Sequence, residues 1–106
     1  MTQDYISYIR SKVGHDKIIL TFAGGILTDK DGRVLLQLRG DKKTWAIPGG
    51  AMELGESTLD TAKREFFEET GIKVQATRFL NVYSNFEEVY PNGDKVQTVV
   101  MIYEFK

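Results

Sequence analysis

The hydrophobic residues of this chain follow two spacings, one typical of a helix and the other of a strand. Near the start, apolar residues recur at helical spacing, at Tyr5, Ile6, Ile9 and Val13. They predict a short amphipathic helix over residues 4–13 that ends at Gly14. Residues 18–28 form a β-rich run, which predicts a long strand. Gly24 and Gly25 interrupt this run and predict either a bulge or a close approach of another backbone.

A second strand is predicted over residues 33–39, after a hairpin turn at residues 29–32. Its side chains alternate, and one face is apolar, with Val34, Leu36 and Leu38. The other face is half polar, with Arg33, Leu35, Gln37 and Arg39. We expect the half-polar face to look into a cleft or into solvent. A polar loop is expected at residues 40–43.

The middle of the chain contains the clearest helix signals. Residues 45–48 form a short extended piece that leads into a Gly-Gly pair. Ser57 is a good helix N-cap, and Asp60 completes a capping-box pattern. Gly71 is a typical residue just past a helix end. We therefore expect a helix between Ser57 and Gly71.

Residues 74–85 and 97–105 read as further strands, joined by a turn at residues 91–94. One central helix among strands, without regular βαβ alternation, predicts an α+β fold or an α/β sandwich built on a mixed sheet. Residues 99–102 make the last strand apolar on both faces. We expect another layer of structure to cover that strand.

Composition narrows the class of protein. The chain has 106 residues, of which 42% are hydrophobic and 27% charged, as in a single soluble globular domain. A formal net charge of −1 argues against binding to a nucleic-acid polymer or an anionic membrane. The absence of cysteine excludes disulfides, zinc–thiolate sites and a cysteine nucleophile. No signal-peptide core or membrane-length apolar run is present, so we expect a cytoplasmic protein.

Glu65, Glu68 and Glu69 form an acidic cluster near the end of the predicted helix. Like charges at this spacing oppose each other by roughly 0.2–0.5 kcal/mol per pair, and the C-terminal end of a helix disfavours anions. Helical geometry places the cluster on the flank of the buried stripe that contains Ala62 and Phe66. Because hard cations such as Mg²⁺ prefer carboxylate oxygens, the cluster predicts a divalent-cation site.

The residues around this cluster resemble the Nudix box, G-x5-E-x7-R-E-U-x-E-E-x-G-U with U apolar. The matching residues are Gly50, Glu56, Arg64, Glu65, Phe66, Glu68, Glu69, Gly71 and Ile72. Every fixed position is filled at the correct spacing, and only Phe66 departs from the usual aliphatic residue. Trp45 and Pro48, with the strand before them, also resemble the approach to the box in the Nudix (MutT-like) hydrolase family. The resemblance implies a single Nudix domain over residues 1–106, with the box at 50–72 and an α/β/α sandwich fold.

The resemblance also implies a chemistry. Nudix proteins hydrolyse the pyrophosphate of a nucleoside diphosphate linked to another group, and they need Mg²⁺ or Mn²⁺. Carried to this sequence, the metal ligands are Glu65, Glu69 and the carbonyl of Gly49. Glu68 is then either a further ligand or the base that activates water. Carried over in the same way, Glu56 and Arg64 orient the loop and the carboxylates.

Substrate contacts are predicted beside the box. Gly50 lets the backbone approach a ligand closely. Arg39 is a candidate phosphate contact and Gln37 a weaker one, although Arg39 could instead pair at the surface with Asp41 or Glu53. The substrate is expected to be a small nucleotide, either an ADP-ribose-type sugar or an (oxidised) nucleoside triphosphate.

Several aromatic and acidic residues have two interpretations. Trp45 is interpreted as a core or loop anchor rather than a platform for a base. Phe22, Tyr83 and Phe86 could stack on a base or pack within the sheet. Glu87 and Glu88 could supply a distal carboxylate to the metal cluster or form a solvated charge pair. Both interpretations are open for Glu53, which lies in the loop of the box.

The family usually continues with a further helix and strand beyond the position of Phe105. We therefore expect a domain that is C-terminally truncated relative to the family, without that helix and strand, or a homodimer in which a partner chain covers the last strand. The alternatives to an enzyme are a non-catalytic nucleotide-binding sensor and a scaffold module. The intact glutamate cluster argues against the sensor, because a binding module does not need repelling carboxylates, whereas the expected C-terminal truncation favours the scaffold module.

Overall fold

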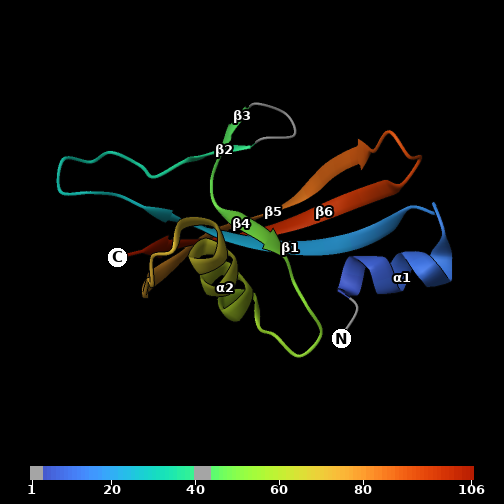
Figure 1. Cartoon of the computed structure of the whole chain (residues 1–106), viewed down its shortest axis with the longest axis horizontal. Helices are drawn as coiled ribbons and strands as arrows, with labels where there is room; N and C mark the ends of the chain where they lie inside the picture. The colour runs from blue at the N-terminus through green and yellow to red at the C-terminus, as the bar shows by residue number, and fades with distance from the viewer. Residues whose placement is uncertain (1–3, 40–43) are drawn as a thin grey trace.

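The computed structural model describes residues 4–39 and 44–106 (Figure 1). Its elements are α1 (Tyr5–Val13), β1 (Ile18–Leu27), β2 (Gln37–Arg39), β3 (Thr44–Ala46), β4 (Gly49–Ala51), α2 (Thr58–Thr70), β5 (Ala76–Val89) and β6 (Lys95–Phe105). One mixed sheet has the order β4-β1-β6-β5, while β2 and β3 form a separate two-stranded ribbon. β1 and β6 are parallel, and the other neighbours in the sheet are antiparallel. The predicted α+β fold with a mixed sheet is confirmed.

The first helix forms where the sequence predicts it. The side chain of Asp4 accepts a hydrogen bond from the Ser7 amide at 2.7 Å, which caps the start of α1. Gly14, with φ of 64°, ends the helix and donates its N–H to the Arg10 carbonyl at 2.8 Å. No residue of α1 is buried, so this helix lies on the surface of the molecule. Among the described residues, no helix is long and apolar enough to cross a membrane.

The two glycines of β1 let other parts of the chain lie close to the strand. Of the two predicted alternatives, a bulge or a close approach, the structure has the close approach. The register between β1 and β6 is continuous from Ile18 to Leu27, so no bulge interrupts this pairing. A Cβ atom on Gly24 would lie 2.7 Å from the carbonyl oxygen of Pro48, and one on Gly25 would overlap the ring of Phe105. Both positions therefore require glycine because of what lies against them.

The predicted strand over residues 33–39 is wrong in its first half. Only Gln37–Arg39 is strand, and Val34 makes no more than an isolated bridge with Thr28. The alternation is present, but the inward face is the opposite one, because Leu35 donates its N–H to the Leu27 carbonyl at 2.9 Å and packs on the core. The apolar side chains on the other face stay between 42% and 55% exposed, at Val34, Leu36 and Leu38. The predicted loop at 40–43 lies outside the described residues.

α2 packs on the sheet through the stripe that the sequence predicts. Ala62 and Phe66 are fully buried, and Leu59 packs against the same cluster. The rings of Phe66 and Phe105 meet edge to face with centroids 5.3 Å apart. This contact holds the helix, and with it the acidic cluster, against the last strand.

The last two strands are longer than predicted. β5 extends to Val89 and β6 begins at Lys95, because their pairing continues up to the turn, with register shifts along β5. The predicted turn is confirmed, since the Tyr90 amide donates to the Asp94 carbonyl at 2.9 Å and Gly93 has φ of 93°. Residues 99–102 are half-buried, with β1 and β5 paired to the two edges of β6.

Candidate active site

The start of α2 is fixed by a reciprocal pair of hydrogen bonds. The hydroxyl of Ser57 accepts from the Asp60 amide at 3.0 Å, and the Ser57 amide donates to the Asp60 carboxylate at 3.2 Å. Gly71 ends the helix in the left-handed conformation, with φ of 76°. The predicted capping box and helix end are confirmed, so both ends of the helix that carries the acidic cluster are set locally.

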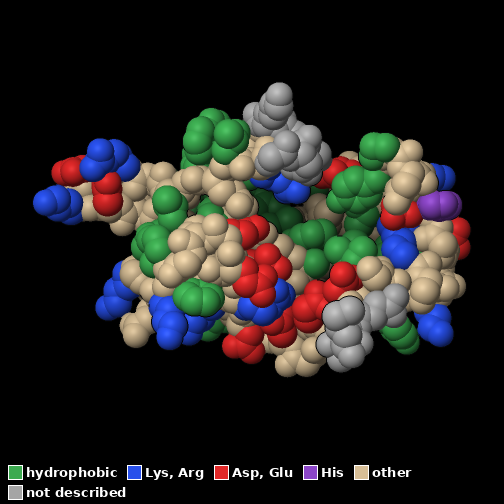
Figure 2. All heavy atoms as spheres, viewed as in Figure 1, with side chains coloured by type: hydrophobic (Ala, Val, Ile, Leu, Met, Phe, Trp, Pro, Cys, Tyr) green, Lys and Arg blue, Asp and Glu red, His purple; other side chains and the backbone are tan. Residues whose placement is uncertain are grey.

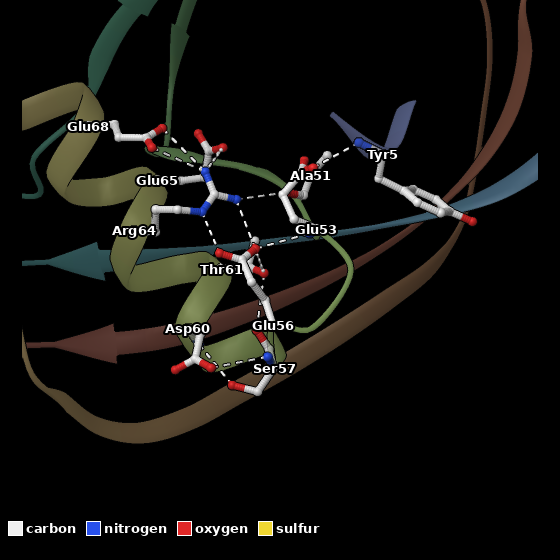
Figure 3. A network of polar contacts seen from close by, with 10 residues as sticks. All are labelled: Tyr5, Ala51, Glu53, Glu56, Ser57, Asp60, Thr61, Arg64, Glu65 and Glu68. Carbon is white, nitrogen blue, oxygen red and sulfur yellow. Dashed lines mark hydrogen bonds and ion pairs between the residues drawn. The ribbon is translucent and has the colours of Figure 1, made fainter. Parts of the chain in front are cut away.

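Arg64 is the centre of a polar network between α2 and the loop before it (Figure 3). Its guanidinium donates to both carboxylate oxygens of Glu56, at 2.5 and 3.0 Å, and to the carbonyl of Ala51 at 3.2 Å. The same group donates to Glu65 at 2.9 Å and approaches Glu68 at 3.3 Å. Arg64 therefore fixes carboxylates of the loop and of the helix relative to each other.

Glu56 is saturated with donors. One of its oxygens accepts from the Glu53 amide at 3.0 Å and from the Thr61 hydroxyl at 2.9 Å, in addition to Arg64. The hydrogen bonds from Arg64 are the largest cause that lowers the pKa of Glu56 from 4.5 to about 2. Glu56 in turn raises the pKa of Arg64 further above its ordinary value. Both groups stay charged at neutral pH, and the supporting role of each stays a prediction.

Glu65 lies against the backbone of β4 at Gly50. A Cβ atom at this position would lie 2.5 Å from Oε2 of Glu65, so only glycine leaves room for the carboxylate. Burial raises the pKa of Glu65, and Glu69 and Glu68 raise it further, while Arg64 opposes them. Glu65 is therefore a half-buried carboxylate that an added cation would stabilise in its ionised form.

The chemistry of these donors fits a divalent cation. The half-buried carboxylate of Glu65 lies against Gly50, and two exposed carboxylates, Glu68 and Glu69, are on the same helix. In residues 4–39 and 44–106, no three acidic or histidine side chains converge in an arrangement that would already hold a metal ion. Arg64 instead engages Glu65 and Glu68. The metal ligands Glu65, Glu69, Glu68 and Gly49 therefore stay predictions.

A cleft of about 950 Å³ adjoins the cluster. Glu69, Gly49 and Gly50 line it, and so do the predicted substrate contacts Gln37 and Arg39. Its apolar lining comes mainly from the sheet and the β5–β6 turn, with Phe22, Phe86, Tyr90, Pro91, Val100 and Ile102. Figure 2 shows the hollow near the middle of the view, with hydrophobic side chains inside it and acidic side chains beside it. The predicted cleft beside the half-polar face is thus present.

The aromatic residues with two interpretations differ in where they lie. Phe22 and Phe86 line the cleft, whereas Tyr83 is not among its described lining residues. Trp45 is 66% exposed on β3, so it is not a core anchor, and its interpretation as a loop anchor stays a prediction. The physical reason is that β3 pairs with β2 in a ribbon outside the main sheet.

The acidic residues with two interpretations differ in their surroundings. Glu87 pairs with Lys17 at 2.5 Å, while Glu88 lines the cleft. Glu53 accepts a hydrogen bond from the Tyr5 amide at 2.8 Å. Asp41, the other proposed partner of Arg39, lies outside the described residues. The sequence did not predict the contact between Glu53 and Tyr5, because the two residues are far apart in the chain.

Comparison with known proteins identifies the class. The profile described as NUDIX domain matches residues 21–105, and the chain therefore belongs to the NUDIX domain family. A MutT-like protein of Streptomyces ambofaciens is 43% identical over 61 residues, which cover 58% of this chain and 40% of that protein. The ADP-ribose pyrophosphatase of Methanocaldococcus jannaschii is 32% identical over 101 residues, which cover 92% of this chain and 54% of that protein.

Solved structures agree with this assignment. The MutT protein of Bacillus halodurans superimposes with a TM-score of 0.66 at 30% identity, over 82% of this chain and 57% of that one. The family and fold predicted from the sequence are thus confirmed. The chain spans about half the length of the relatives it matches.

Proposed function

We propose that this protein is a metal-dependent hydrolase that cleaves the pyrophosphate of a nucleoside diphosphate linked to another group. The observation that carries the proposal is the position of Glu65. Arg64 holds its carboxylate in the space left by Gly50, and Gly50 itself lines the cleft together with Glu69. A carboxylate fixed beside a large cleft suits a cation that must meet a phosphate there.

In this proposal Glu65, Glu69 and the carbonyl of Gly49 hold Mg²⁺ or Mn²⁺. When bound, the cation supplies Lewis acidity and neutralises phosphate charge. Glu68 is 55% exposed on its side chain, and it either completes the ligand set or accepts the proton of the attacking water. Glu56 holds Arg64, and Arg64 keeps Glu65 in place through its hydrogen bond. Neither Glu56 nor Arg64 changes charge near neutral pH.

The rest of the cleft suits the remainder of a nucleotide. Phe22, Phe86 and Tyr90 offer an apolar and aromatic surface of the kind on which a base stacks. Arg39 offers a guanidinium for a phosphate, with Gln37 beside it on β2. ADP-ribose-type sugars and (oxidised) nucleoside triphosphates are the substrate classes that we propose to test first.

The test is a panel of nucleoside diphosphate derivatives assayed with Mg²⁺ or Mn²⁺ for release of a nucleoside monophosphate. We expect turnover of at least one compound, its loss on chelation of the metal, and its loss in Glu69→Gln. This variant should stay folded because it removes charge repulsion within the cluster. Turnover that survives chelation would contradict the metal dependence, and an unfolded Glu69→Gln protein would contradict the account of the cluster.

A second candidate is a catalytically silent Nudix domain that binds a nucleotide as a sensor or scaffold. The observation in its favour is that Arg64 already pairs with Glu65 and Glu68. This candidate predicts binding of a nucleotide without turnover of any compound in the same panel. A homodimer and a cytoplasmic location also stay predictions, and a mass measurement in solution tests the first.

A further inference from the structure

Glu53 joins two parts of the molecule that are 48 residues apart in sequence. Its carboxylate accepts a hydrogen bond from the backbone amide of Tyr5 at 2.8 Å. Tyr5 is the first residue of α1, where backbone amides have no partner within the helix and where the helix dipole favours a negative charge. Glu53 therefore anchors the start of this surface helix.

The backbone of the same residue closes the turn that presents Glu56. The Glu53 amide donates to Oε1 of Glu56 at 3.0 Å, and the Glu53 carbonyl accepts from the Glu56 amide at 3.2 Å. Gly55 supplies the left-handed conformation of this turn, with φ of 88°. A displacement of Glu53 would thus remove a donor from Glu56 and open the turn around it.

From Glu56 the contacts continue without a gap to the candidate metal ligand. Glu56 binds Arg64 through both of its oxygens, and Arg64 donates to Glu65 at 2.9 Å. Figure 3 shows the resulting line of contacts from the start of α1 through the loop to the face of α2. Each link is a hydrogen bond to a charged group, the strong kind.

We propose that Glu53 is a positioning residue, through which the docked helix α1 holds the loop and thereby Glu56, Arg64 and Glu65 in their working arrangement. The proposal deepens the function proposed above and depends on it for its catalytic consequence. Supporting groups behind metal ligands typically change metal affinity or activity by about 10–100-fold when they are removed.

A purely structural role is the alternative, in which Glu53 stabilises α1 and nothing else. The far end of α1 is held independently, since Arg10 donates to the Lys95 carbonyl and to the Asp16 carbonyl, each at 2.7 Å. Loss of Glu53 would then loosen the first turn of the helix and leave the arrangement of Arg64 unchanged. The two roles therefore differ in what they predict for Arg64.

The experiment compares Glu53→Ala, which removes the acceptor, with Glu53→Gln, which keeps an oxygen for the Tyr5 amide. Glu104→Ala is the matched control, because Glu104 also accepts a hydrogen bond, from Thr77 at 2.6 Å, but on the last strand. The first readout needs no metal and no substrate. It is the hydrogen exchange of the Arg64 Nε–H, which donates to Glu56, followed by NMR in metal-free protein.

We expect Glu53→Ala to exchange the Arg64 Nε–H at least about fivefold faster, with Glu53→Gln and Glu104→Ala close to the parent protein. With a turned-over substrate, Glu53→Ala should lower kcat about tenfold and raise the half-saturating Mg²⁺ concentration severalfold, at nearly constant KM. Glu53→Gln should restore most of both.

An unchanged Arg64 exchange rate in folded Glu53→Ala would overturn the proposal, as would a Glu53→Gln protein as impaired as Glu53→Ala. If no compound of the panel is turned over, the proposed function fails, but the exchange measurement still decides the role of Glu53. If turnover is normal in Glu53→Ala, the proposed function stands and this inference falls.

Discussion

A Cβ atom added to Gly50 would lie 2.6 Å from Oε1 and 2.5 Å from Oε2 of Glu65. Gly50 is in the extended strand β4, so its backbone is one that alanine can adopt and the penalty is steric. We predict that Gly50→Ala folds but pushes the Glu65 carboxylate off the strand. Overpacking of this kind costs about 1–3 kcal/mol, measured by urea unfolding. Misplacement of the candidate ligand should lower kcat by about tenfold or more.

The steric origin of this effect can be isolated with a second substitution. Glu65→Ala removes the carboxylate that the new Cβ would meet, so the double variant should regain the stability that Gly50→Ala loses, while activity is lost with the carboxylate. A coupling free energy close to zero in this double-mutant cycle would show that the two residues do not touch.

Glu56 predicts a pH dependence of stability. Its pKa is lowered from 4.5 to about 2 in the folded protein, so the folded state binds fewer protons than the unfolded state in this range. The stabilisation is therefore complete above pH 4.5 and is lost as the pH falls towards 2. We predict that Glu56→Gln destabilises the protein by on the order of 2–3 kcal/mol at pH 7. The difference from the parent protein should shrink steadily between pH 4.5 and 2 in urea titrations, and a constant difference would contradict the ion pair with Arg64.

At the scale of an element, the residues of α2 that stabilise the helix lie apart from those that form the candidate site. The capping box joins Ser57 and Asp60 at the end of the helix that lies away from the acidic cluster. We predict that Ser57→Ala lowers the free energy of unfolding by about 1 kcal/mol, because the Asp60 amide loses its acceptor. The kcat should stay within about twofold of the parent value, since Phe66 and Phe105 still hold the helix on the sheet. A large loss of kcat would mean that the cap also sets the position of the glutamates.

Elements with local signals could be predicted from the sequence, and elements decided by distant contacts could not. Ser57 and Gly71 mark the two ends of α2 within the helix itself, so its bounds followed from the sequence. Residues 33–36 have strand-like alternation, but only the contact of Leu35 with the end of β1 decides which face points inward. The family resemblance indicated which residues form the candidate site. It could not indicate the bond between Tyr5 and Glu53, which exists only because α1 folds back onto the loop.

At the scale of the whole molecule, the cleft is shared between the main sheet and the β2–β3 ribbon. Glu69 of α2 and the glycines of β4 line the candidate metal end, the sheet contributes most of the apolar floor, and the ribbon contributes Gln37, Leu38 and Arg39. The reacting end and the binding end of a substrate would therefore be held by different parts of the fold. Such a division predicts that kcat and KM respond to different residues.

Arg39 tests this division. If its guanidinium binds a substrate phosphate that is not the one attacked, Arg39→Ala should raise KM about tenfold and leave kcat nearly unchanged. Arg33→Ala is the matched control, because Arg33 is 77% exposed and pairs with Asp29 at 2.7 Å in the preceding turn. Both are measured with the best substrate of the panel over a range of ionic strength. A KM that both variants raise equally would point to general electrostatic attraction. A bound phosphate cannot lose its cation without a loss of affinity, so an unchanged KM in Arg39→Ala would assign Arg39 to pairing at the surface.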